Sequence, residues 1–405
     1  MKSQSRPPLR QDERAKRAGL PSRRAALGAV PAPKPLAIAL IRQRYAGDGG
    51  AERFVARMLD TLKDRARLTL LTREWSPSPG FEVLTCNPLY IGRWWRDQSF
   101  AREVCRRVAT RRFDLVQSHE RIACCDVYRA GDGLHREWLK NRARVLGPLA
   151  RLGTVLNPYH RYLLAAERRL FESPRLRAVV CNSRMVRDEV KHHFALADEK
   201  LHVIYSGVDT SVYHPDLKRE RAAVRASLGL VSAAPLFLFV GSGFERKGLA
   251  VALHAVAQLP GAQMMVIGRD RRAARYQALA QKLGLGERAQ FLGAIDDVKP
   301  YYGAADALVL PTLYDPFPNV ALEAMACGLP VVTSTTSGAA ELIANGHNGY
   351  VCDALDVETL TAHLRAAVDP ARHAALCEQA RRTVEPLTLE AASRQWLDLY
   401  ASLTR

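Results

Sequence analysis

The chain of 405 residues is too long for one ordinary hydrophobic core and has the length of two domains. Apolar residues make up 48% and charged residues 25%, which is a globular composition, and no apolar run approaches the roughly 18 residues of a membrane span. The net charge of +18 is uneven, because residues 1–34 carry +7, residues 91–177 carry +10 and residues 178–405 carry −1. This asymmetry indicates that one half of the protein meets an anionic partner.

Residues 1–34 are rich in Arg, Pro and Ala and lack hydrophobic periodicity, which predicts a disordered basic tail. The segment has no apolar region of the kind that a secretory signal peptide needs. The eight cysteines lack CxxC spacing, so we expect reduced packing residues in a cytosolic protein rather than metal ligands.

Short apolar runs separated by helical patterns begin at Pro35 and predict parallel sheets with helices on both faces. The first series comprises Pro35–Gln43, Arg67–Arg73, Phe113–His119, Arg177–Ser183 and Leu201–Gly207. Turn residues in Ser206–Asp216 then predict a linker. The second series comprises Ala234–Gly243, Ala262–Asp270, Ala289–Ile295, Ala305–Thr312, Leu329–Ser334 and Asn348–Asp353.

We therefore predict an α/β protein of two Rossmann-like, doubly wound domains that face each other across a cleft. Residues 35–206 form the first domain, residues 207–387 the second, and a C-terminal helix at 388–405 is expected to pack back on the first. Ligands of such sheets bind at the carboxyl ends of the strands, so the loops there are candidates for the site.

A glycine-rich loop, GSGFERKGL, follows the first strand of the second domain. Gly243 permits close approach of an anion, and the adjacent Arg246 and Lys247 could neutralise a diphosphate. The alternative is a strand-to-helix turn with solvated charges; GxxxxGK[ST] is absent, so the loop is no P-loop. In the first domain, GDGGAE places Gly49 and Gly50 in a tight loop beside the cleft.

The stretch LYDPFPNVALEAMACGLPVVTS contains a helix between two breaks. Pro316 and Pro318 exclude a helix through DPFP, whereas Pro318 suits the first helical position, where its missing N–H is not needed. We predict a helix from Pro318 to Cys327, closed by Gly328.

Asp315 precedes this predicted helix and Glu323 lies about one and a half turns inside it. The two acids therefore cannot form a tight pair, and we expect them to contact different parts of one extended ligand. The backbone N–H groups of Asn319 and Val320 are candidates for binding an anion. A surface Asp with a solvated or N-capping Glu is the alternative.

Four stretches together resemble the family 4 retaining glycosyltransferases of the GT-B fold, which transfer sugars from nucleotide donors: GSGFERKG, ADALVLPTLYDPFPNVALEAMACGLPVVTS, GAAELIANGHNGYV and SGVDTSVYHP. The resemblance covers nearly everything after residue 35. Within the family, FERKG, VYRAGD and the basic middle segment look most like the lipopolysaccharide core glucosyltransferases, which add glucose to the inner-core heptose.

The resemblance implies roles for the donor residues. Glu323 would hold the ribose hydroxyls, Asp315 would reach the 3- and 4-hydroxyls of the donor sugar, and Arg246 with Lys247 would bind the diphosphate. The sequence departs from the family in having Asp315 for a Glu and Pro318 where a glycine is usual, which bears on the choice of sugar.

On the acceptor side the resemblance implies roles for Asp132, as an acid, for His119, as a cleft histidine, and for Glu52 in the GGAE loop. With Lys247 and Asp315, Asp132 and His119 complete the candidate catalytic set. A histidine satisfied at a strand end and an aspartate that caps a helix are the alternatives. Asp296–Asp297 looks like a metal-binding pair but is expected to cap the next helix. The resemblance implies that no metal is needed, and the UDP-sugar is a substrate, so no cofactor is expected.

The predicted function is retaining transfer of a hexose, glucose by resemblance, from a UDP-sugar to a lipid-linked glycan, the inner-core heptose of lipopolysaccharide. No carboxylate nucleophile is obvious, so a front-face mechanism is implied, in which the leaving phosphate accepts the proton of the acceptor. Segment 91–177 interleaves aromatic residues with nineteen Arg or Lys. That pattern suits an anionic membrane surface and a phosphorylated acceptor, which predicts a peripheral protein at the inner face of the cytoplasmic membrane.

Three alternatives remain open from the sequence. The basic segment could be a solvated Arg-rich face, and nucleic acid is not an expected partner. A non-hydrolysing UDP-sugar 2-epimerase would share the fold but would not need a basic, lipid-facing domain. A non-enzymatic binder of anionic glycolipid or nucleic acid is the third class.

Overall fold

The computed structural model describes residues 36–44, 66–74 and 82–404. Residues 35–405 form one unit, separate from residues 1–34. The predicted tail and the predicted loop residues Gly49, Gly50 and Glu52 lie outside the described residues. None of the helices in the described ranges is both long enough and apolar enough to cross a membrane.

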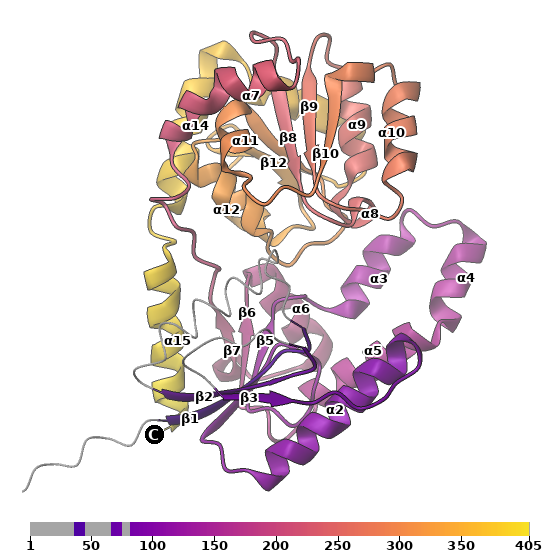
Figure 1. Cartoon of the computed structure of the whole chain (residues 1–405), viewed down its shortest axis with the longest axis vertical. Helices are drawn as coiled ribbons and strands as arrows, with labels where there is room; N and C mark the ends of the chain where they lie inside the picture. The colour runs from indigo at the N-terminus through magenta and orange to yellow at the C-terminus, as the bar shows by residue number, and fades with distance from the viewer. Residues whose placement is uncertain (1–35, 45–65, 75–81, 405) are drawn as a thin grey trace, which may run out of the picture. The chain divides into compact units, whose positions relative to one another are not determined.

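The first sheet is parallel and, within the described ranges, has seven strands in the order β3-β2-β1-β4-β5-β6-β7 (Figure 1). They are β1 (Leu36–Ile41), β2 (Ala66–Thr72), β3 (Glu82–Thr85), β4 (Leu115–Ser118), β5 (Val127–Ala130), β6 (Ala178–Cys181) and β7 (Leu201–Val203). The sequence predicted five of them. It missed the edge strand β3 and also β5, in which the charge of Arg129 interrupts a short apolar run.

Alternation along β1 assigns the two faces of this sheet to different helices. Ala39 and Ile41 belong to one apolar cluster, and Ile38 and Leu40 belong to another. The first cluster contains side chains of α2 (Gly92–Thr110), α5 (Pro158–Phe171) and α6 (Arg184–Phe194). The second contains side chains of α15 (Leu389–Thr404), including the buried Trp396. The last helix of the chain thus completes the core of the first sheet.

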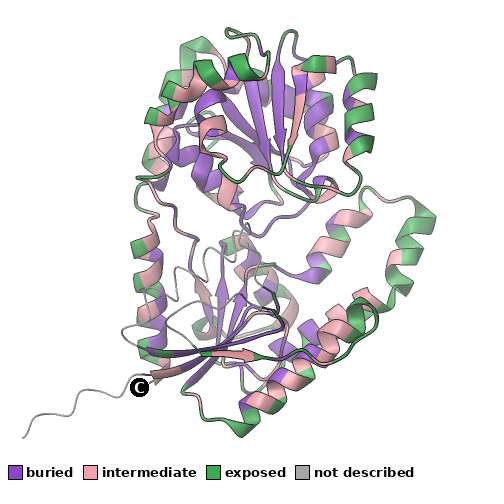
Figure 2. Ribbon diagram, viewed as in Figure 1, coloured by how far each residue is buried: buried purple, intermediate pink, exposed green. Residues whose placement is uncertain are grey.

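The second sheet is also parallel, with six strands among the described residues in the order β10-β9-β8-β11-β12-β13. They are β8 (Leu236–Val240), β9 (Gln263–Ile267), β10 (Ala289–Gly293), β11 (Ala307–Leu310), β12 (Val331–Ser334) and β13 (Gly349–Cys352). All six were predicted. The side chains of five of these strands are nearly all buried (Figure 2), as expected of a parallel sheet covered on both faces, whereas in the edge strand β10 only Ala289 is buried. The strand order reverses between β8 and β11, and ligands of doubly wound sheets bind at such a point.

Apolar clusters on either side of the second sheet include the helices that cover it. One cluster contains side chains of α9 (Leu249–Ala257), α10 (Ala273–Lys282) and α13 (Val357–Ala367). The other contains side chains of α11 (Lys299–Ala304), α12 (Asn319–Ala326) and α14 (Pro370–Val384). The other α-helices in the described part of the chain are α3 (His135–Ala143), α4 (Pro148–Leu156), α7 (Arg221–Ser227) and α8 (Phe244–Lys247).

The chain passes between the two sheets twice, and the two passages touch. The Val208 N–H donates to the carbonyl of Leu387 at 2.9 Å, and Val208 pairs with Thr388 in an isolated parallel bridge. A Cβ at Gly207 would lie 2.5 Å from the Thr388 carbonyl oxygen, so only glycine fits there without displacing the backbone. The outgoing linker and the returning chain are therefore held together before α15 begins.

A disulfide corrects one expectation from the sequence. Cys105 on α2 and Cys124 before β5 are bonded, with Cα atoms 5.7 Å apart, so these two of the eight cysteines are not reduced. They lie 19 positions apart, and only the packing of α2 beside the turn before β5 brings them together. The other six are free and buried, and burial raises the pKa of Cys327 to about 12, which keeps its thiol protonated.

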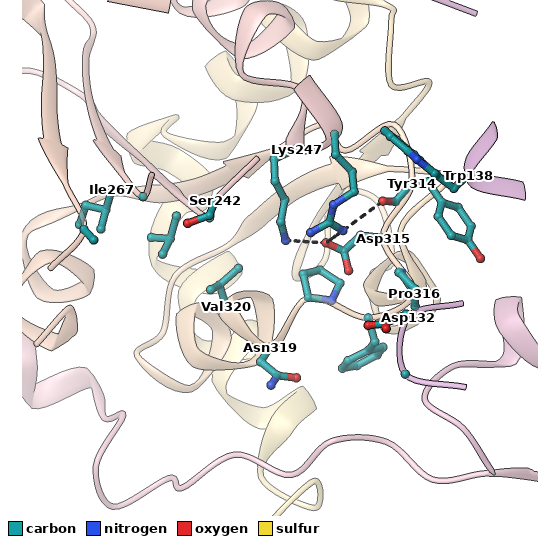
Figure 3. A pocket seen from close by; sticks show the side chains of 18 of the residues that line it. Asp132, Trp138, Ser242, Lys247, Ile267, Tyr314, Asp315, Pro316, Asn319 and Val320 are labelled. Atoms are coloured by element: carbon teal, nitrogen blue, oxygen red, sulfur yellow. Dashed lines mark hydrogen bonds and ion pairs between the residues drawn. The ribbon is translucent and has the colours of Figure 1, made fainter. Parts of the chain in front are cut away.

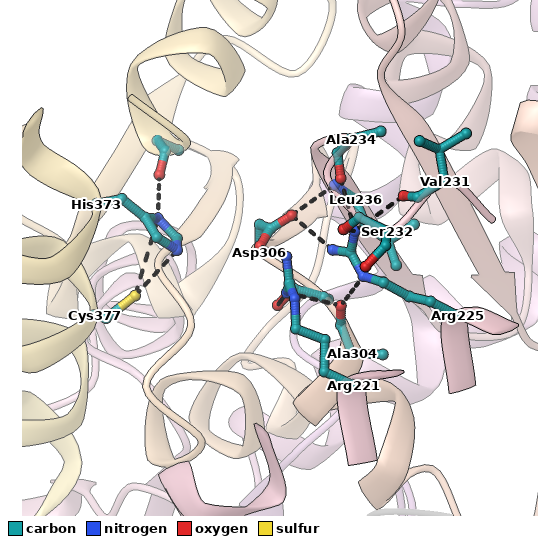
Figure 4. Close-up of polar contacts among 12 residues, drawn as sticks. Arg221, Arg225, Val231, Ser232, Ala234, Leu236, Ala304, Asp306, His373 and Cys377 are labelled. Carbon is teal, nitrogen blue, oxygen red and sulfur yellow. Dashed lines mark hydrogen bonds and ion pairs between the residues drawn. The ribbon is translucent and has the colours of Figure 1, made fainter. Parts of the chain in front are cut away.

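A buried arginine on α7 ties this helix to the second sheet (Figure 4). Arg225 is 1% exposed and donates to the carbonyl oxygens of Ser232 and Ala234 at 2.7 and 2.8 Å. Its Nη2 also lies 2.9 Å from Oδ2 of Asp306, which accepts the Leu236 N–H at the start of β8. Most of its donors are thus satisfied without water, so the side chain should be structural.

We expect Arg225→Met to lower the free energy of unfolding by about 3 kcal/mol, because it leaves Asp306 and several carbonyls without their buried partner. Arg221→Met is the matched control, since Arg221 also pairs with Asp306 at 2.8 Å but is 36% exposed, and it should cost about 1 kcal/mol or less. Urea denaturation of both variants measures the difference, and equal losses would contradict a special role for the buried arginine.

Candidate functional site

A cavity of about 1180 Å³ lies at the carboxyl ends of the strands of the second sheet and is also lined by residues of the first domain (Figure 3). The second domain contributes loops that follow β8, β9, β10 and β11, together with the start of α12. The first domain contributes the start of α2, the loop after β5, and parts of α3 and α5. Among the predicted residues, this cavity collects Asp132, Arg246, Lys247, Asp315, Asn319, Val320 and Glu323.

Two glycines shape the loop that carries the cations. Gly243, at φ 79°, precedes the single turn of α8, and Gly248, at φ 77°, follows it. A Cβ at Gly248 would lie 1.9 Å from the Pro311 carbonyl oxygen, so the turn is pressed against the end of β11. β8 and β11 are neighbours in the sheet, and this contact fixes Arg246 and Lys247 beside the loop after β11.

Lys247 and Asp315 form a buried ion pair. The Lys247 Nζ lies 2.5 Å from Oδ2 of Asp315, and Nη1 of the more exposed Arg246 lies 3.2 Å from the same oxygen. Burial alone would raise the pKa of Asp315, but the two cations outweigh it and hold that pKa below its ordinary value. Burial lowers the pKa of Lys247, and the Asp315 carboxylate opposes that shift. Asp315 is therefore an ionised, buried group and not a surface aspartate.

Glu323 is held by a different partner. It lies on α12, and its Oε2 accepts the hydroxyl of Tyr302 at 2.9 Å, in a buried environment. The two acids thus have separate partners within one cavity, and Glu323 is neither solvated nor an N-cap. The helix begins one residue later than predicted: Pro318 is the N-cap, with ψ 111°, and the helix runs from Asn319 to Ala326.

The structure places the two residues predicted on the acceptor side, Asp132 and His119, in different surroundings. Asp132 lines the cavity, whereas His119 is not among the described residues that line it. His119 is buried beside Gln117, with its Nε2 3.0 Å from Nε2 of Gln117. Burial and the charges of Arg129 and Arg42 hold the pKa of His119 well below its usual value, so the ring is neutral. This placement favours the alternative of a histidine satisfied at a strand end.

The two aspartates considered as helix caps also differ. Asp132 does not cap the following helix, because α3 has Leu134 as its N-cap without a side-chain bond. Asp297 accepts the Lys299 N–H at 3.2 Å just before α11, but the N-cap of that helix is Val298, without a side-chain bond, so the predicted cap is only approximated.

The structure adds cavity residues from the first domain that the sequence did not predict as site residues. Trp138, His135 and His160 line the cavity, and Nε2 of His135 lies 3.0 Å from Nδ1 of His160. Arg121 also lines it, donating to Glu167 at 3.0 Å and to the Gly133 carbonyl at 2.9 Å. These residues come from α3, α5 and the turn after β4, and no short motif unites them.

Contacts between the domains surround the cavity. Arg142, at the end of α3, donates to Glu245 on α8 at 2.9 Å. Tyr314, which precedes Asp315, donates its hydroxyl to Glu189 on α6 at 2.6 Å. Burial raises the pKa of Glu189 to about 7, against the lowering effect of the Tyr314 bond. A carboxyl group in this contact therefore titrates near neutral pH.

Two family models match the chain in sequence. Residues 48–212 match "Glycosyltransferase Family 4", and residues 220–383 match "Glycosyl transferases group 1". The two matches fall on the first and the second sheet, respectively. The cavity therefore takes residues from both matched regions.

Curated relatives and a solved structure extend the match. A lipopolysaccharide core biosynthesis glycosyltransferase of Rhizobium meliloti is 33% identical over 183 residues, 45% of this chain and 54% of that protein, so the match spans about half of its length. The lipopolysaccharide glucosyltransferase WaaG of Escherichia coli is 27% identical over 342 residues, 82% of this chain and 89% of the relative. The crystal structure of WaaG superposes with a TM-score of 0.78 at 25% identity, covering 90% of this chain and 99% of that one. The predicted GT-B fold is confirmed.

We expect Glu189→Gln to remove a pH dependence of stability. Because the folded-state pKa of Glu189 is raised from about 4.5 to about 7, its contribution is fully present below pH 4.5 and is lost as the pH rises through 7. The loss in the wild type should be on the order of 2 kcal/mol. Thermal unfolding at pH 5 and pH 8 measures it, with the exposed Asp188→Asn on the same helix as control. An unchanged pH dependence in Glu189→Gln would refute the assignment.

Proposed function

We propose that this chain, which belongs to the GT-B glycosyltransferases with a family 4 domain followed by a group 1 domain, transfers glucose from UDP-glucose to a lipid-linked glycan. The acceptor we propose is the inner-core heptose of lipopolysaccharide, and the anomeric configuration of the donor is retained. The similarity to a lipopolysaccharide glucosyltransferase over 82% of the chain supports this choice of donor and acceptor.

The observation that carries the donor assignment is the separation of the two acids within one cavity. Tyr302 donates to the Glu323 carboxylate, and we propose that this carboxylate accepts hydrogen bonds from the ribose hydroxyls. Asp315 lies at the cation pair, where the diphosphate would bind and the sugar would follow. A nucleoside diphosphate sugar is an extended ligand with ribose hydroxyls at one end, sugar hydroxyls at the other and the charged diphosphate between them. Glu323, the cation pair and Asp315 would meet these three parts in this proposal.

The cations supply the chemistry that the reaction needs. As the bond between the anomeric carbon and the phosphate breaks, negative charge grows on the leaving diphosphate. Lys247 and Arg246 line the cavity, and in this proposal they stabilise the leaving group with little reorganisation when that charge develops. We propose a front-face reaction in which the leaving phosphate oxygen takes the acceptor proton, Asp132 orients the acceptor hydroxyl, and no metal takes part.

In this proposal the first domain binds the acceptor and contacts the membrane. α4 is exposed along its length (Figure 2), and its apolar side chains include Leu149, 87% exposed, and Val155, 69% exposed. An apolar helix face in a segment of net charge +10 fits an anionic bilayer, because lipid tails cover the apolar side chains and headgroups attract the arginines. We propose that the protein sits at the inner face of the cytoplasmic membrane through this helix.

A donor screen tests the proposed reaction. Purified core lipopolysaccharide is incubated with UDP-glucose, UDP-galactose or GDP-glucose, and transfer is measured by mass spectrometry. We expect transfer from UDP-glucose. Transfer only from the GDP donor would refute the nucleotide assignment. Conversion of a UDP-sugar to its epimer without acceptor would instead establish the epimerase reaction.

Lys247→Ala should lower kcat/KM for transfer by a factor of about 10² to 10³, because a preorganised cation beside the leaving group is lost. Glu323→Gln should mainly raise the donor KM, since it weakens ribose binding and leaves the reacting centre intact. Steady-state kinetics measures both, with the exposed Lys282→Ala on α10 as the control and circular dichroism to verify folding. Near-normal kinetics in Lys247→Ala would contradict the proposed diphosphate site.

Replacing Leu149 and Val155 by Gln should weaken binding to vesicles that contain phosphatidylglycerol by about tenfold or more, because two apolar side chains no longer enter the lipid. Transfer to a soluble, delipidated acceptor should not change. Val231→Gln is the matched control, an exposed apolar residue of the second domain. Vesicle co-sedimentation measures binding, and equal binding by all variants would show that α4 does not dock on the bilayer.

A further inference from the structure

Tyr314 joins the two domains through its hydroxyl. The side chain is buried, its Oη accepts the backbone N–H of Leu134 at 2.9 Å, and it donates to Oε2 of Glu189 at 2.6 Å. Tyr314 comes from the loop after β11, whereas Leu134 follows β5 and Glu189 lies on α6. A phenol can both accept and donate, so this one group satisfies two partners from the opposite domain.

Gly133 shows how closely the two loops approach. Its φ of +63° is a conformation that side chains disfavour, and a Cβ there would lie 2.2 Å from Oη of Tyr314 and 2.7 Å from Cγ of Pro316. On the other side, a Cβ at Gly338 would lie 1.8 Å from the Pro316 carbonyl oxygen. The segment Tyr314–Pro316 is thus fixed between two glycines that have no room for a side chain.

Each loop carries one of the candidate acids next to this contact. Asp315 follows Tyr314 directly, and its backbone is held by the Thr336 carbonyl at 3.0 Å and the Gly338 N–H at 2.8 Å. Asp132 lies two positions before Leu134, in the loop of residues 131–134. Both acids line the same cavity (Figure 3), so the Tyr314 hydroxyl links the donor acid to the acceptor acid.

We infer that Tyr314 is a positioning residue whose hydroxyl sets the loop of residues 131–134, and with it Asp132, against the donor acid Asp315. The inference rests on the proposed function for the roles of the two acids. Glycosyl transfer requires the acceptor oxygen in line with the anomeric carbon, and small displacements of positioning groups cost rate steeply. If the loop moves away, water reaches the same carbon: its oxygen bonds to the anomeric carbon, the bond to the phosphate breaks, and the proton leaves with UDP.

Tyr314→Phe tests the inference, because it keeps the ring and removes only the hydroxyl. We expect kcat for transfer to fall about tenfold, the donor KM to stay within about twofold, and the ratio of donor hydrolysis to transfer to rise severalfold. Tyr350→Phe is the matched control, a buried tyrosine of the same domain whose hydroxyl has no hydrogen-bond partner among the described residues. A fall in transfer without a rise in the hydrolysis ratio would show a purely structural role and overturn the inference.

Gly133→Ala is a second variant that leaves Tyr314 intact and displaces the loop by steric overlap. It should raise the ratio of donor hydrolysis to transfer in the same way. In the double variant Gly133→Ala, Tyr314→Phe the increase in this ratio should be smaller than the product of the two single increases, because both substitutions disturb one contact. Fully multiplicative effects would mean that the two residues act independently, against the inference.

Hydrogen exchange separates a failure of the inference from a failure of the proposed function. The Leu134 amide donates to Tyr314, so its exchange should accelerate in Tyr314→Phe and stay at the wild-type rate in Tyr350→Phe. This readout needs neither donor nor acceptor. If exchange at Leu134 is unchanged in Tyr314→Phe, the positioning role is overturned, even if the proposed transfer reaction is confirmed. If exchange is faster but the enzyme uses another donor, the contact is established and only the proposed substrates are refuted.

Discussion

The buried ion pair between Lys247 and Asp315 is the constraint on which the rest of the site depends. An ammonium group removed from water must be paired, and its partner must sit within about 3 Å to offset the cost of desolvation. That requirement fixes the loop after β8 against the loop after β11, which adjacent strands and the close fit of Gly248 on Pro311 make possible. Pro316 and Pro318 keep the chain between Asp315 and α12 out of the helix, so Asp315 lies in the loop that meets Lys247.

The fold of the second domain was largely predictable because its strands are short, mainly apolar runs, and all but the edge strand β10 are buried on both faces. The first domain was harder to predict. β5 contains Arg129 and β3 is a four-residue edge strand, so neither has the apolar pattern by which buried strands are recognised. The disulfide between Cys105 and Cys124 was missed for a related reason: helix packing, and not spacing in the sequence, brings the two sulfurs together.

In the candidate site too, residues that stand in short sequence motifs were predicted, and residues that depend on distant partners were missed. The cation pair, Asp315 and Glu323 stand in two short stretches with informative glycines and prolines, so the sequence identified them. Tyr302 and Tyr314 gave no such signal, because a buried tyrosine in an apolar context is usually a packing residue. Their roles depend on hydrogen-bond partners that are distant in the sequence: the partner of Tyr302 is 21 positions away and that of Tyr314 is 125 positions away, and only the folded chain brings them together. His119 shows the opposite case, in which a familiar motif marked a residue that the fold buries outside the described cavity lining.

Charge alone is an incomplete guide to the membrane-binding surface proposed above. Many arginines of segment 91–177 are engaged within the protein: Arg121 holds Glu167, Arg142 reaches Glu245, and Arg144 binds both carboxylate oxygens of Asp353. Glu167 is already subtracted in the net charge of +10, whereas Glu245 and Asp353 lie outside the segment, so their pairs make the effective charge of the segment smaller than +10. The exposed apolar residues of α4 have no such internal partner and are costly to leave in water. In the proposed docking, the exposed apolar face of α4 should therefore decide which side of the protein meets the bilayer. The arginines without an acidic partner should decide how strongly the lipid composition and the salt concentration change the binding affinity.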